Sequence, residues 1–102
     1  MASNYAFAPL GATIFVGAAA VQINVAPIGP NSYRVRNLSG AVQYFTHGQT
    51  GSVSSVGAPS SGVPSNNTIG MLPNSVETFT GLLPWMIASS AMGFEVTPGD
   101  GV

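Results

Sequence analysis

The segment SYRVRNLSGAVQYFTHG, residues 32–48, constrains the fold more than any other part of the sequence. Tyr33 and Val35 alternate with Arg34 and Arg36, which is the period of two expected of a β-strand with one buried face. The turn formers NLSG follow, and then the β-branched and aromatic run AVQYFT. The sequence therefore predicts two antiparallel strands joined as a hairpin, with both of the chain's basic residues on one face.

Short segments of the same kind recur along the chain, and Gly and Pro residues separate them. No segment sustains a helical period, so the sequence predicts an all-β fold, a small β-sandwich or jelly roll with six to eight strands. Besides the two central strands, the predicted strands are residues 13–16, 20–25, 76–80, 85–89 and 93–97.

A chain of 102 residues fits one domain, and we assign residues 1–102 to it. We expect residues 1–11 to form an extended arm, because Tyr5, Phe7 and Pro9 alternate with small residues and this alternation stops at Pro9, and we expect residues 12–102 to form the sandwich. Residues 48–68 are rich in Gly, Ser and Pro and carry no charge, which predicts a long loop. Loops of this length in compact domains are usually functional or disordered.

The chain is unusually poor in charge. It has two basic and three acidic residues and no Lys, so 5% of its residues are charged where about 25% is ordinary. A monomer with a net charge of only −1 lacks the repulsion that keeps small domains apart. We therefore expect the surface to be covered by other copies, and we predict a homotrimer.

Several partner and cofactor classes are disfavoured. Two arginines make no basic field, so nucleic acid is not an expected partner. The apolar run LGATIFVGAAAV at residues 10–21 is shorter than the roughly 20 residues of a spanning helix, so no membrane partner is expected. Without Lys no P-loop can form, and neither a G-x-G-x-x-G run nor cysteine ligands are present, so we predict no cofactor and no metal.

The sequence predicts no catalytic residues and no enzyme activity. His47, Asp100 and the many serines could formally make a Ser-His-Asp arrangement, but no G-x-S-x-G elbow supports it. Glu77 and Glu95 could be imagined as a glycosidase pair, but acids on strands are more often solvated or paired with arginine. One His with three acids shows no metal-ligand spacing.

Candidate interface residues lie in the arm, the loop and the strands. Tyr5 and Phe7 lie on one side of the extended arm and could anchor it in a partner's groove, although terminal residues are often frayed. Val53 and Val56 are the corresponding candidates in the long loop. The arm and the loop are the predicted binding elements, with the sandwich as their scaffold.

The remaining candidates are Arg34, Arg36 and Trp85. The two arginines project from one face, and we predict that they meet Glu77, Glu95 or carboxylates of a neighbouring subunit. Trp85 is expected to be a core or interface anchor, and the alternative is a platform on which a sugar ring stacks.

The aromatic arm with Tyr5 and Phe7, the segment YRVRNLSGAVQYFTHG, the Gly-Ser loop and the ending FEVTPGDGV together span the whole chain. In this combination the sequence resembles small virion proteins of tailed bacteriophages, namely capsid decoration or cement proteins and related head or tail accessory proteins. The resemblance implies a small β-sandwich, often trimeric, that sits on the lattice of the major capsid protein and strengthens it. This family has no shared catalytic residues to transfer.

The expected function is therefore that of a structural virion protein, made in the host cytoplasm and located on the capsid surface, with the major capsid protein and other copies of itself as partners. The alternative is a carbohydrate-binding or fibre-type adhesion module that uses Trp85 and tyrosines.

Overall fold

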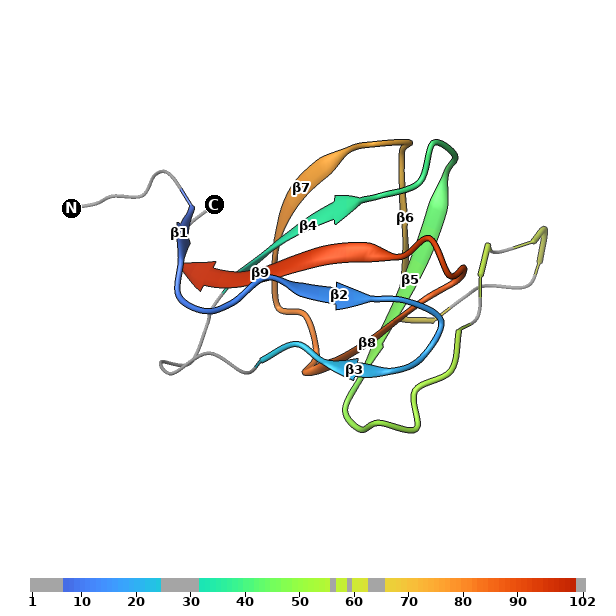
Figure 1. Cartoon of the computed structure of the whole chain (residues 1–102). Coiled ribbons are helices and arrows are strands. Elements are labelled where there is room, and N and C mark those ends of the chain that lie inside the picture. The colour runs from blue at the N-terminus through green and yellow to red at the C-terminus, as the bar shows by residue number, and fades with distance from the viewer. Residues whose placement is uncertain (1–6, 25–31, 56, 59, 63–65, 101–102) are drawn as a thin grey trace.

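A computed structural model describes residues 7–24, 32–55, 57–58, 60–62 and 66–100. This part of the chain is all-β, as predicted, and contains no helix and therefore none that could cross a membrane. Nine strands form two antiparallel sheets (Figure 1). They are β1 (Ala8–Pro9), β2 (Ile14–Val16), β3 (Val21–Gln22), β4 (Ser32–Asn37), β5 (Gln43–Gly48), β6 (Thr68–Met71), β7 (Val76–Thr80), β8 (Trp85–Ala88) and β9 (Phe94–Asp100).

The order of the strands is that of a jelly roll. One sheet runs β9-β4-β7, with β1 and β2 both paired to the outer edge of β9, and the other runs β3-β8-β5-β6. The chain pairs from its ends inward, β2 with β9, β3 with β8, β4 with β7 and β5 with β6. It is thus one long antiparallel ribbon folded over on itself, with the loop between β5 and β6 at its tip.

The core lies between the two sheets and follows from the alternation along the strands. Val35 on β4 and Val96 on β9 are opposite each other and fully buried. Phe45 on β5 reaches across from the second sheet, and its ring makes edge-on contacts with Phe79 on β7 at 5.6 Å and with Phe94 on β9 at 5.3 Å between ring centroids. These aromatic contacts join the two sheets.

The predicted hairpin in residues 32–48 is wrong. Both of its strands exist, but β4 belongs to one sheet and β5 to the other, so the segment is an arch between sheets (Figure 1). The backbone of the connection bonds to neighbouring turns, because the Leu38 N–H donates to Gly93 O at 3.3 Å and Ser39 O accepts from the Asn74 N–H at 3.0 Å. These distant partners replace the cross-strand bonds of a hairpin.

Two further differences concern strand limits. β6 begins at Thr68, the last residue of the predicted loop, and was not predicted. β9 runs to Asp100, although Pro98 and Gly99 predicted a final turn. Pro98 is tolerated because its missing N–H faces the interruption between β1 and β2, where the register with β9 shifts by two residues.

Candidate functional site

Two buried amide side chains hold together the turns at one end of the sandwich. Asn37, at the end of β4, is fully buried, and its Nδ2 donates to the carbonyl oxygens of Ala41 at 3.1 Å, Met71 at 3.2 Å and Leu72 at 2.9 Å. Its Oδ1 accepts from the Ser39 N–H at 2.9 Å. A single side chain thus binds the turn after β4 to the turn after β6.

Gln43, the second amide, extends this network to the turn between β8 and β9. Its Nε2 donates to Asn37 Oδ1 at 2.8 Å and to Gly93 O at 2.9 Å. Its Oε1 accepts from the Gly93 N–H at 3.1 Å and from the Ser90 hydroxyl. Every polar atom of both amides is therefore bonded, which holds together the turns at residues 38–42, 72–75 and 89–93. We call the surface formed by these three turns the turn end.

The turn end and the sheet next to it carry the exposed large hydrophobic side chains of the described chain. Val42 and Leu72 flank the paired residues Gln43 and Met71, and Met92 immediately precedes Gly93. The other two, Phe15 on β2 and Val76 on β7, lie on opposite edges of the first sheet, with β9 and β4 between them. All five are at least half exposed, and the three on the turns share one end of the sandwich, as exposed apolar groups at interaction sites often do.

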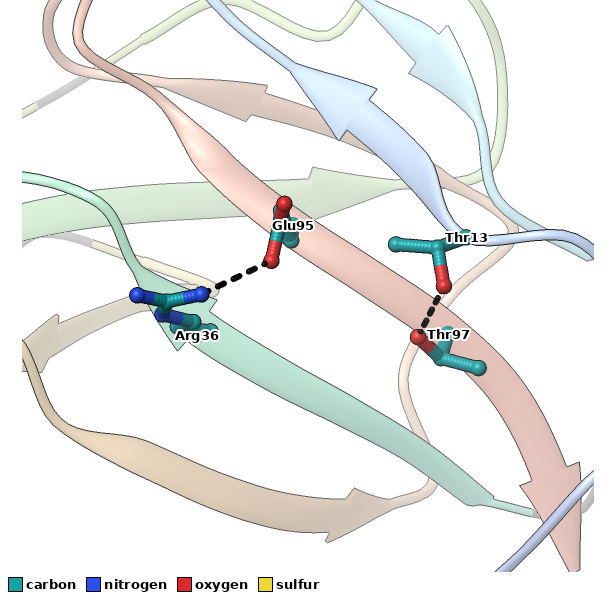
Figure 2. A network of polar contacts seen from close by, with 4 residues as sticks. All are labelled: Thr13, Arg36, Glu95 and Thr97. Carbon is teal, nitrogen blue, oxygen red and sulfur yellow. Dashed lines mark hydrogen bonds and ion pairs between the residues drawn. The ribbon is translucent and has the colours of Figure 1, made fainter.

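The outer face of the β9-β4-β7 sheet carries both arginines, and Figure 2 shows Arg36 on this face beside Glu95. The guanidinium of Arg36 lies 3.4 Å from Glu95 Oε1 on β9, which confirms the predicted pairing with an acid for this residue. Nearby, the hydroxyls of Thr13 and Thr97 are hydrogen-bonded at 2.8 Å. Glu77 is opposite Val35 in the register, so its side chain projects toward the other face of the sheet.

Arg34 meets an aromatic ring of the arm. Its guanidinium carbon lies 4.8 Å from the centroid of the Phe7 ring, a cation–π contact. Phe7 is 9% exposed and lies against Gly99, where any side chain would overlap the ring. Phe7, one of the two predicted aromatic anchors of the arm, therefore packs against its own domain. Tyr5, the other, lies outside the described residues.

The first part of the long loop returns to the outer face of the other sheet. Val53 is half-buried and lies so close to Gly48 that a Cβ there would be 2.9 Å from it. Gly51 packs similarly against the Trp85 ring, with 3.2 Å to the nearest ring carbon from the position of a Cβ. Trp85 is thus half-buried, and its ring contacts the chain's own loop. Val56 lies outside the described residues.

His47 has a structural hydrogen bond. Its Nδ1 accepts from the Leu83 N–H at 3.1 Å, and partial burial lowers the pKa of its imidazole. In the described part of the chain, no group of three or more His, Cys, Asp or Glu side chains could hold a metal ion.

The two buried amides were not predicted from the sequence. Asn37 was interpreted as a turn former, and Gln43 was not singled out. Their spacing of six residues, with one turn between them, was the only local signal.

The histidine gives the fold an expected pH dependence. Because the pKa of His47 is lowered on folding, its contribution to stability is complete above the unfolded pKa, about 6.5, and is lost as the pH falls through the folded pKa. We expect His47→Gln to reduce the loss of stability between about pH 7.5 and about pH 5. Urea unfolding followed by Trp85 fluorescence measures this, and an unchanged pH dependence would contradict it.

Comparisons with known proteins found no family model, no curated protein and no solved structure that matches this chain.

Proposed function

We propose that this chain is a structural protein of a virus particle, a capsid decoration or cement protein that binds the lattice of the major capsid protein. The observation that supports it is that three exposed apolar side chains, Val42, Leu72 and Met92, lie on the turns at one end of the jelly roll. Jelly rolls occur in viral capsid proteins, lectins and cupins, so the fold alone does not select the function.

Two properties of the surface favour a capsid protein among these classes. Turns already ordered by Asn37 and Gln43 lose little backbone entropy when their apolar groups bind a partner, which suits a protein that acts by holding a neighbour in place. Only 5% of the residues are charged, so a free monomer would have little charge repulsion to keep it in solution. In this proposal the chain is not an enzyme, it acts on the capsid surface, and it assembles as a homotrimer.

Labelling of particles tests the proposal. Antibodies against the recombinant chain should label the shells of virus particles released by cells that carry the gene, when these are viewed by immunogold electron microscopy. Particles from cells in which the gene is deleted are the control. Absence of label from intact particles would overturn the proposal.

A glycan array tests the alternative from a different class. The Trp85 ring already contacts Gly51, which leaves less of it for a sugar. Binding of the recombinant chain to an arrayed glycan, lost in Trp85→Ala, would favour a carbohydrate-binding module over the capsid protein.

A further inference from the structure

Four half-exposed side chains form a row across the outer face of the first sheet at its turn end. Phe15 on β2 is opposite Glu95 on β9, Glu95 is opposite Arg36 on β4, and Arg36 is opposite Val76 on β7. Residues directly opposite in antiparallel strands point to the same side, so all four side chains project outward. Phe15 and Val76 are 54% and 52% exposed, and the Arg36 and Glu95 side chains are 55% and 42% exposed.

The chemistry of this row is complementary to itself. Its order is apolar, acidic, basic, apolar, with one strand spacing of about 4.8 Å between neighbours. A two-fold axis parallel to the strands, between β9 and β4, reverses the order on a second copy. Arg36 of each copy then faces Glu95 of the other, and Phe15 faces Val76.

We propose that two copies of this chain pack through this row, face to face, as an isologous dimer. The Arg36–Glu95 pair within one chain, which Figure 2 marks with a dashed line, does not oppose this, because both side chains are about half exposed. An exposed pair of this kind contributes little by itself, so its two groups can bond across the interface at small cost. The apolar ends of the row supply the burial that drives association.

The charges favour a second copy over a different protein. The row has no net charge, so an acidic or basic patch on a different protein would attract one of its two charged side chains and repel the other. What fits is a surface that carries a base and an acid at strand spacing between apolar ends, and this face has that arrangement. Phe7 does not obstruct the row, because it lies over Gly99 toward the other end of β9.

The inference does not depend on the proposed function. A two-fold contact cannot close a trimer, so it predicts an even number of copies: a dimer, or a hexamer if the proposed trimer also forms. Light scattering of the purified chain at tens of micromolar should therefore give a dimer or a hexamer. A monomer alone or a trimer alone would overturn the inference.

Mixing two charge-reversal variants tests the contact itself. Arg36→Glu makes the row doubly acidic and Glu95→Arg makes it doubly basic, so each variant repels its own copies. We expect the dimer dissociation constant of each to rise at least about tenfold. In an equimolar mixture each chain meets the opposite pair, and heterodimers should form with an affinity within about threefold of the unchanged chain.

Rescue by mixing separates the interface from the fold, because the like charges within each variant chain are the same before and after mixing. Native mass spectrometry distinguishes the heterodimer by mass. Glu77→Arg is the control, since it makes the same charge change on the other face of β7 and should leave the dimer unchanged. If a reversal variant fails to fold by circular dichroism, Phe15→Ser should weaken the dimer at least about tenfold. Mixtures that form no heterodimer, or a Phe15→Ser chain that dimerises normally, would overturn the inference.

Discussion

Replacement of Asn37 by alanine is expected to lower the free energy of unfolding by about 3–5 kcal/mol. The change removes five hydrogen bonds and leaves the carbonyl oxygens of Met71 and Leu72 without this donor. Gln43 also loses one of its acceptors, so the link between three turns opens. A domain of this size has about 5–15 kcal/mol in total, so the loss is a large share of its stability.

Asn37→Asp separates polarity from shape. The variant keeps the volume of the side chain but turns the donor toward three carbonyl oxygens into an acceptor, so we expect it to be at least as unstable as Asn37→Ala. Ser39→Ala is the matched control, because it removes one exposed hydrogen bond in the same turn and should cost less than about 1 kcal/mol. Urea unfolding at constant pH measures all three. If the Asn37→Asp variant were as stable as the unchanged chain, this role for the amide would be contradicted.

Replacement of Phe45 by alanine is expected to cost about 3–5 kcal/mol. The ring is fully buried and contacts both Phe79 and Phe94 on the opposite sheet, so its removal leaves a cavity where the two sheets meet. Phe45→Leu retains most of the apolar volume and should cost less than half as much.

Phe15→Ala provides the matched control for the core, since the same ring there is half exposed. In dilute solution, where association contributes little, it should change the free energy of unfolding by less than about 1 kcal/mol. Equal losses for Phe45→Ala and Phe15→Ala would show that the space between the sheets is not the main hydrophobic core.

The candidate surface was partly predictable. The alternation in residues 32–37 placed Arg34 and Arg36 on one face, and the structure confirms an acidic partner for Arg36. The partner of Arg34 was not predicted, because Phe7 reaches it only through the pairing of β1 with the far end of β9. The exposed hydrophobic residues at the turn end were also missed. Val42 falls in a predicted strand, and Leu72 and Met92 fall between predicted strands. Only the fold shows that all three lie on turns at the same end of the sandwich.

The sequence by itself determined that this chain is all-β, because the period of two and the Gly and Pro turns are local properties of residues close in the chain. Only the tertiary structure decided which strands pair. Residues 32–48 have the local pattern of a hairpin, yet β4 pairs with β7 and β9 while β5 pairs with β6 and β8. The deciding bonds join Asn37 to carbonyl groups 34 and 35 residues away and Gln43 to Gly93, 50 residues away. Such partners leave no periodic signal in a short window, because the energy that selects them exists only when the two sheets have come together.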